Sequence, residues 1–336
     1  MSGSNEKFHV LGIGNAIVDI LAHAGDDFLA AHGLEKGATT LIDENRAGTL
    51  YEAMGPAVEC SGGSAANTIA SLAGLGASTA FVGKVRDDLF GDIFRHDIKA
   101  LGVSFDTRSS HAGAPTARCM VFVTPDAERT MQTHLGACVE LGPEDIDVET
   151  VSEARVTYLE SYLWDPPRAK EAFLKAADIA HSLDKQVSLS LSDPFCVDRH
   201  REDFLDLIRD HVDILFANEE ELKGLYQTDA LDDAVAAVNG HCAIAAVTLG
   251  EQGSIIVSED QVIEIKAEKV DQVKDTTGAG DGFAAGFLFG LTKGFGLETS
   301  GRLGSVVAAE IISHMGARSD ADLKALVNKS IPNLNI

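Results

Sequence analysis

Short apolar runs alternate with longer segments of helical periodicity along most of this chain, and beyond residue 150 the alternation becomes regular. The pattern predicts strands at 79–85, 155–160, 186–192, 212–216, 243–248 and 253–257. It predicts helices near 64–75, 87–101, 166–183, 199–210, 218–225, 230–240, 279–293 and 297–314. Such an alternation is typical of a mostly parallel sheet with helices on both faces.

Besides the helices at 64–75 and 87–101, the first 134 residues contain further strand-like segments. An apolar run that ends in glycines predicts a buried first strand, and Ser64 is expected as the N-cap of the first long helix. The remaining segments predict a small β accessory built from two insertions, at about 17–42 and 103–134. We therefore expect a single α/β domain over residues 1–336 that carries this second sheet.

The charge of the chain narrows the partners that it can have. The 336 residues include 27 Lys and Arg against 52 Asp and Glu, which gives a formal net charge of −25. That excess argues against nucleic acid or an anionic membrane surface as the main partner. It leaves a small anionic ligand open, because backbone dipoles and one or two arginines can reverse the field inside a cleft.

Cysteine usage and the N-terminus predict a cytoplasmic location. The 5 cysteines are widely spaced without a C-x-x-C pair, which disfavours a disulfide framework or a zinc site. The first residues lack the pattern of a secretory signal, and no run reaches the roughly 18 apolar residues of a membrane-spanning helix.

One glycine-rich segment predicts a site for phosphoryl transfer. It reads Asp275-Thr276-Thr277-Gly278-Ala279-Gly280-Asp281-Gly282-Phe283, and it precedes an apolar helix. Small residues at 278–280 leave backbone N–H groups bare at a helix N-terminus, where they can hold an anion. A carboxylate at Asp281 would repel that anion, so it is better suited to take a proton from a hydroxyl that attacks the anion.

This segment resembles the C-terminal signature of the ribokinase-like (PfkB) kinases. Three further stretches resemble that family in the same order: Ser61-Gly62-Gly63-Ser64-Ala65-Ala66-Asn67-Thr68 with the glycines that follow it, Asn218-Glu219-Glu220-Glu221, and Thr248-Leu249-Gly250-Glu251-Gln252-Gly253. The resemblance covers about residues 8–318. It implies a three-layer α/β/α domain with a mostly parallel central sheet and a small β-sheet lid, and an enzyme that transfers phosphate from ATP to an alcohol.

The resemblance also implies roles for individual residues. Asp281 is expected as the general base, with the amides of Gly278, Ala279 and Gly280 as the anion hole and Arg129 as a lid residue over the phosphates. The acceptor is expected to contact Asn15, Asp19, Gly62, Gly63, Asn67, Tyr162 and Phe195. ATP is expected to contact Asn218, Thr248, Gly250, Gly253, Thr277 and His314.

The same resemblance implies sites for metal ions. Asn218 and Glu221 are expected to position Mg²⁺ through water, which suits an ion that keeps much of its hydration shell. Asp275 and Thr277 leave open a site for a monovalent cation such as K⁺.

The resemblance leaves more than one molecule open as the phosphate acceptor. Two segments, at 158–163 and 189–195, resemble the adenosine kinase branch and favour adenosine, with AMP as the product and purine salvage as the role. The Thr-Thr pair at 276–277 is shared with many sugar kinases, so a ribokinase- or fructokinase-like sugar kinase remains an alternative. A catalytically silent nucleotide-binding homologue is a third, and both a monomer and a lid-mediated homodimer fit the sequence. A nicotinamide dehydrogenase is disfavoured, because the loop at 12–17 lacks the third glycine of the dinucleotide fingerprint.

Overall fold

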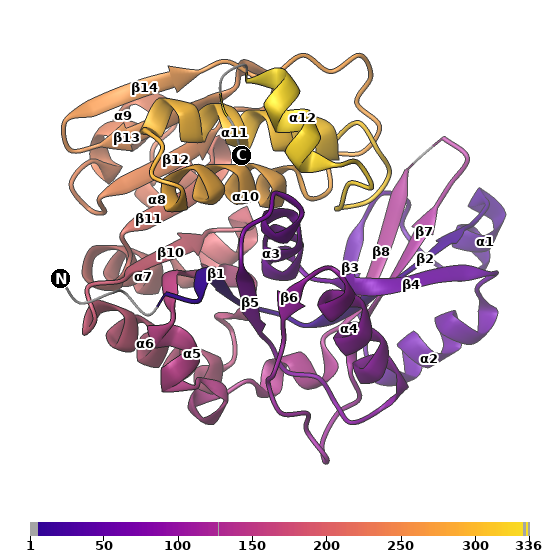
Figure 1. The fold of residues 1–336 in the computed structure, drawn as a ribbon. Coiled ribbons are helices and arrows are strands. Elements are labelled where there is room, and N and C mark those ends of the chain that lie inside the picture. The colour runs from indigo at the N-terminus through magenta and orange to yellow at the C-terminus, as the bar shows by residue number, and fades with distance from the viewer. Residues whose placement is uncertain (1–5, 127, 332–333, 335–336) are drawn as a thin grey trace.

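Two sheets of unequal size organise the computed structural model, which describes residues 6–126, 128–331 and 334 (Figure 1). The large sheet has nine strands in the order β14-β13-β12-β11-β10-β9-β1-β5-β6. Every neighbouring pair from β6 to β12 is parallel, and only β13 and β14 add antiparallel edge strands. The strands are β1 (Phe8–Ile13), β5 (Thr79–Val82), β6 (Val103–Ser104), β9 (Ala154–Glu160), β10 (Gln186–Ser190), β11 (Ile214–Asn218), β12 (Ile244–Thr248), β13 (Ser254–Ser258) and β14 (Gln261–Ile265).

Helices cover both faces of this sheet, and a separate apolar core fills each side. One face carries α3 (Ser64–Gly74), α4 (Leu89–Ala100), α10 (Ala279–Thr292), α11 (Leu297–Ile311) and α12 (Leu323–Ser330). The other carries α5 (Val148–Ser152), α6 (Pro167–His181), α7 (Pro194–His211), α8 (Glu219–Tyr226) and α9 (Leu231–Val238). The predicted three-layer α/β/α fold is confirmed.

The buried helix α10 shows how glycine shapes this core. A Cβ atom at Gly286 would collide with the backbone of Leu303 on α11, and one at Gly290 would collide with Ser300. The missing side chains let the two helices approach closely, and the apolar side of α10 then packs on the sheet through Phe287. The start of α10, which carries the signature segment, is thereby held in a fixed place.

The small sheet projects from one end of the large sheet (Figure 1). Its order is β3-β8-β7-β2-β4, from β2 (Ile17–His23), β3 (Thr39–Leu41), β4 (Ala57–Gly62), β7 (Ala117–Val123) and β8 (Arg129–His134). The helices α1 (Asp26–Ala31) and α2 (Glu44–Ala53) belong to the same region.

The predicted insertion limits need correction at both ends. Strand β4 extends the first insertion to residue 62; its glycine-rich end and exposed start hid it from the hydrophobic pattern. The second insertion begins later than residue 103, because β6 pairs with β5 at the edge of the large sheet.

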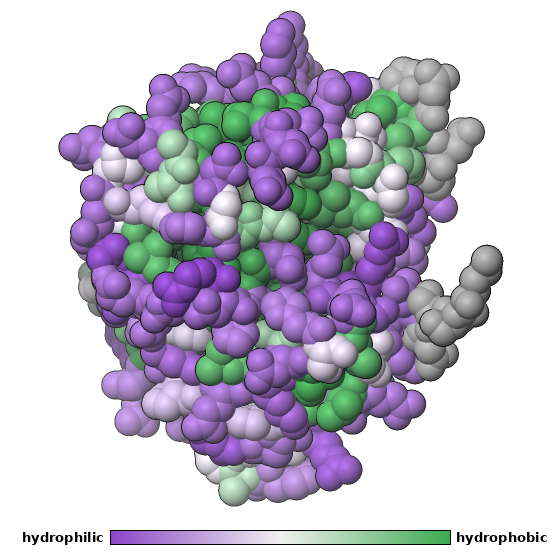
Figure 2. Space-filling model, turned by 90° about the vertical axis from the view of Figure 1, so that its left-hand side faces the viewer, coloured by the Kyte–Doolittle hydropathy of each residue, from purple (hydrophilic) through white to green (hydrophobic). Residues whose placement is uncertain are grey.

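Figure 2 shows a face covered mostly by hydrophilic residues, with hydrophobic residues visible in patches between them. Among the described residues, no helix has both the length and the apolar character needed to cross a membrane.

Candidate active site

A cleft of about 920 Å³ lies between the small sheet and the carboxyl ends of the parallel strands. Ser190, Asn218 and Thr248, each at the end of its strand, line it on one side, and strands of the small sheet line it on the other. This volume is near the upper end of the range for one bound ligand, about 300–1,000 Å³. The carboxyl ends of the strands are also where open α/β sheets bind ligands.

The signature loop places free backbone donors at the floor of this cleft. Gly278 adopts a φ of +78° and caps α10. Among the described residues, the amides of Gly278, Gly280 and Asp281 make no hydrogen bond, whereas the amide of Ala279 donates to the Thr276 carbonyl oxygen at 3.1 Å. Three N–H groups at a helix N-terminus therefore remain for an anion. The expectation that Ala279 contributes its amide is wrong in this structure, because that amide closes the turn.

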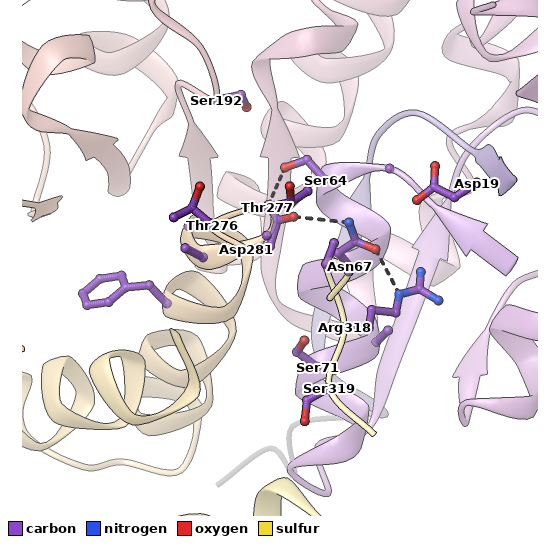
Figure 3. Close-up of a pocket in the computed structure, with 18 of the residues that line it drawn as sticks. Asp19, Ser64, Asn67, Ser71, Ser192, Thr276, Thr277, Asp281, Arg318 and Ser319 are labelled. Carbon is purple, nitrogen blue, oxygen red and sulfur yellow. Dashed lines mark hydrogen bonds between the residues drawn. The ribbon is translucent and has the colours of Figure 1, made fainter. Parts of the chain in front are cut away.

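Asp281 lies beside these amides in the first turn of α10. Its Oδ1 accepts a hydrogen bond from the Ser64 hydroxyl at 2.6 Å and its Oδ2 accepts one from Asn67 Nδ2 at 3.3 Å (Figure 3). Withdrawal from water raises the pKa of Asp281 to about 6, although the two hydrogen bonds lower it. The result is a carboxylate that can hold a proton near neutral pH, as a general base requires.

Ser64 was expected to cap α3, and the structure corrects that expectation. The N-cap of α3 is Gly63, whose φ of +101° brings it against the Asn15 carbonyl oxygen, where a Cβ atom would not fit. Ser64 is the first helical residue, and its hydroxyl is directed to Asp281 instead of to its own helix.

Asp19 lines the part of the cleft where the acceptor is predicted to bind. This carboxylate makes no hydrogen bond with any described residue, and burial raises its pKa to about 6. Gly62 lies directly against it, since a Cβ atom at Gly62 would overlap the Asp19 carboxylate. Asp19, Gly63 and Asn67 line the cleft as expected, whereas Gly62 only makes room for Asp19.

Asn15 and Glu160 lie beneath this surface. The buried Glu160 accepts hydrogen bonds from the Asn15 amide at 2.7 Å and from the Ala65 amide at 2.5 Å, and burial raises its pKa to about 7. Asn15 does not line the cleft, which corrects its assignment as a contact residue. Glu160 was missed by the sequence reasoning; its only signal was an acidic residue at the end of a predicted buried strand.

Arg129 of β8 reaches across the cleft to the signature loop. Its Nε lies 2.9 Å from Asp275 Oδ2, and both side chains are buried, although the angle is not that of a hydrogen bond. The same carboxylate accepts hydrogen bonds from the amides of Thr277 at 2.9 Å and Gly316 at 2.8 Å. Donors and a guanidinium thus surround Asp275, so this carboxylate does not fit a ligand of a monovalent cation.

The cleft is also lined by five of the residues predicted to contact ATP or Mg²⁺, namely Asn218, Glu221, Thr248, Gly250 and Thr277. Asn218 and Glu221 bond to each other, because the Glu221 amide donates to Asn218 Oδ1 and Asn218 Nδ2 donates to Glu221 Oε1. Burial raises the pKa of Glu221 to about 7. A carboxylate held in this way fits a hydrated Mg²⁺ better than a directly bound one.

Three expected ligand contacts lie outside the cleft. Gly253 is at a strand turn, where a Cβ atom would meet the Ile265 carbonyl oxygen. His314, which follows the end of α11, bonds to Glu310 Oε1 at 2.5 Å. Phe195 is 75% exposed at the start of α7, whereas Tyr162 does line the cleft and donates its hydroxyl to the Ser192 carbonyl oxygen at 3.1 Å.

A second residue that sequence reasoning missed is Arg318, in the loop between α11 and α12. It lines the cleft and bonds to Asn67 and Ser61. It belongs to none of the four motifs, so nothing in the sequence pattern distinguished it from a surface arginine.

Known proteins share this architecture. A structure of adenosine kinase from Sinorhizobium meliloti is 51% identical, with a TM-score of 0.89 and coverage of 97% of this chain and 100% of that chain. A probable sugar kinase from Rhizobium etli is 50% identical, with a TM-score of 0.90 and coverage of 97% and 99%. Adenosine kinase from Schizosaccharomyces pombe is 27% identical over 92% of this chain and 96% of its own length. The model of the pfkB family carbohydrate kinases matches residues 45–324, so this chain belongs to that family and is a phosphotransferase with an alcohol group as acceptor.

Proposed function

We propose that this protein transfers the γ-phosphoryl group of ATP to the 5′-hydroxyl of adenosine. The observation that carries the proposal is the Asp281 carboxylate beside three unbonded amides at the start of α10. A base and an anion hole in one helix turn are what an attack by an alcohol on a phosphate needs.

The chemistry follows from these groups. The 5′-hydroxyl gives its proton to Asp281, its oxygen bonds to the γ-phosphorus, and the bond to the leaving oxygen of ADP breaks. The amides of Gly278 and Gly280 donate to the oxygens of the transferred group, and the charge of Arg129 offsets its negative charge. Asn218 and Glu221 would hold Mg²⁺ through water, and the ion would supply positive charge against the phosphate groups.

The lining of the cleft supports a nucleoside as acceptor. The small sheet turns a mainly apolar wall towards the cleft, made of Ile17, Leu21, Val121 and Met131. A purine offers an apolar face to such a wall, whereas a free sugar has hydroxyl groups that would lose water there without a partner. Asp19, in the same wall, and Asn67 on α3 can accept and donate hydrogen bonds to the ribose hydroxyls.

The adenosine kinases of Sinorhizobium meliloti and Schizosaccharomyces pombe, to which this chain is similar, support the same acceptor. A sugar kinase is the second candidate, because the Rhizobium etli relative is named a probable sugar kinase at similar identity. ADP release measured with adenosine, ribose and fructose separates the two. Turnover of a sugar without turnover of adenosine would overturn the proposal.

A matched variant tests the role of Asp281. D281N should lose about 10³-fold or more in kcat, because a positioned base contributes roughly 10²–10⁴-fold. Binding of ATP, measured by calorimetry, should remain. A D281N enzyme with the wild-type rate would remove Asp281 as the base.

A further inference from the structure

Arg318 connects a network of polar side chains at the cleft, made of Asn67, Ser61 and Asp97. Its Nε donates to Asn67 Oδ1 at 2.9 Å, and its Nη1 donates to the Ser61 hydroxyl at 2.8 Å and lies 3.5 Å from Asp97 Oδ2. Asp97 in turn accepts hydrogen bonds from the amide and the hydroxyl of Ser61. Arg318 therefore connects the C-terminal loop to α3 and to β4 of the small sheet.

The bond to Asn67 decides which way the Asn67 amide faces. A guanidinium has donors only, so the atom that faces Arg318 Nε must be the amide oxygen. The NH₂ group then faces Asp281, where it donates to Oδ2 at 3.3 Å. Figure 3 shows Asn67 between Asp281 and Arg318, with one hydrogen bond to each of them. Without Arg318 the amide could turn and place its oxygen against the carboxylate.

The charge of Arg318 acts on the same carboxylates. The charged and titratable groups that face Asp281 are Arg318, Asp19, Glu160, Tyr158 and Tyr162. Arg318 is the cation among them and lowers the pKa of Asp281, whereas Asp19 raises it. Arg318 is likewise the leading charge that lowers the pKa of Asp19.

This placement is costly for the fold. Burial lowers the pKa of Arg318, and its Nη2 is buried without a hydrogen-bond partner in the part of the chain that the structure describes. A buried charge with an unsatisfied donor destabilises a protein, and such features concentrate at functional sites.

We infer that Arg318 is a positioning residue of the phosphoryl-transfer site, which orients the Asn67 amide towards Asp281 and keeps Asp281 ionised. The inference rests on the proposed role of Asp281 as base. It assigns a function to the loop between α11 and α12, which none of the family-like motifs includes.

The direct test needs no substrate. The carboxyl group of Asp281 is titrated by NMR in protein labelled with ¹³C-aspartate, and its signal is assigned from its loss in D281N. The midpoint should rise by about half a pH unit or more in R318M, because a nearby cation is removed. An unchanged midpoint overturns the inference. A wild-type protein that phosphorylates neither adenosine nor a sugar would refute the proposed function, yet would leave this titration interpretable.

Kinetics with the accepted substrate provide the second readout. R318M should lower kcat/KM for the acceptor at least tenfold at pH 6.5, shift the acid limb of its pH profile upwards, and leave KM for ATP within about twofold. R302A, at an exposed position on α11, is the matched control and should behave as wild type. Equal losses for both substrates with an unshifted pH profile would indicate a merely structural role.

R318K separates orientation from charge and decides the matter if R318M does not fold. Lysine keeps the charge but cannot donate to Asn67 and Ser61 with a planar fork. The titration midpoint should stay close to that of wild type while kcat/KM for the acceptor falls. A lysine variant with the wild-type kcat/KM would overturn the orienting role.

Discussion

The Ser64 hydroxyl donates a hydrogen bond to Asp281 Oδ1 at 2.6 Å, across 217 positions of the chain. The bond joins the first residue of α3 to the first turn of α10, so both helix N-termini point towards one carboxylate. Partial positive charge from each helix end stabilises the ionised form. A side chain expected to cap its own helix thus supports the carboxylate that we propose as the base.

The variant S64A tests this bond. Loss of a hydrogen bond to a charged group costs about 1.5–3 kcal/mol, so the pKa of Asp281 should rise by roughly one to two pH units. At pH 6.5 kcat should fall about tenfold or more, and much of the loss should be recovered at pH 8.5. A loss that is the same at both pH values would contradict this explanation.

The raised pKa of Asp281 also predicts an effect on stability. The pKa of Asp281 is about 6 in the folded protein, above the usual Asp value of 3.8. Ionised Asp281 therefore destabilises the fold fully above pH 6, and this destabilisation disappears as the pH falls below 3.8. Because the side chain is partly open to the cleft, we expect D281N to stabilise the protein by about 1–2 kcal/mol at pH 8. Thermal unfolding at pH 8 and pH 4.5 measures the difference, which should shrink at the lower pH. A D281N protein that melts below wild type at pH 8 would contradict it.

Gly280 offers a test of the anion site that leaves the fold intact. A Cβ atom there meets no other atom within 4 Å, so G280A should fold normally and project a methyl group into the space for phosphate. KM for ATP should rise about tenfold or more, while the melting temperature stays the same or increases slightly. G296A, which also meets nothing within 4 Å, is the control and should have wild-type kinetics.

Asp275 predicts independence from monovalent cations. Its carboxylate is already occupied by two amides and Arg129, so replacing KCl with choline chloride at constant ionic strength should change kcat by less than twofold. Strong activation by K⁺ would show that a cation binds despite these donors. The rates are compared by ADP release at saturating substrates.

The hydrogen bonds of Glu160 to the backbone amides of Asn15 and Ala65 predict a structural role for this residue and no part in a chemical step. Each carboxylate oxygen of Glu160 accepts one backbone N–H, and in E160Q an NH₂ group replaces one of these oxygens. One buried N–H then has no acceptor, so the free energy of unfolding should fall by about 1–3 kcal/mol. KM for the acceptor should increase because the loop that carries Asn15 and the start of α3 at Ala65 lose their common anchor. The exposed E52Q serves as control in the same denaturant titration.

The parallel sheet and the phosphate site could be predicted because each depends on local sequence. Strand–helix alternation gives β9 to β12, and a glycine-rich start of an apolar helix gives the amides beside Asp281. The predictions fail where contacts between distant parts of the sequence determine the position of a side chain. The bond of Ser64 to Asp281 and the position of Phe195 outside the cleft depend on segments that are distant in sequence, and Arg318 acquires its meaning only when its loop folds back onto α3.

The chain passes between the two sheets at residues 14–16 and again at Gly63, and Glu160 holds the amides on either side of these passages. Any rotation of the small sheet must twist the backbone at these points, which lie close in sequence to Asp19 and Asn67, the residues proposed to bind the acceptor. An acceptor molecule bound beside these two passages would restrict their backbone motion. Binding of the acceptor would therefore limit rotation of the small sheet before ATP binds.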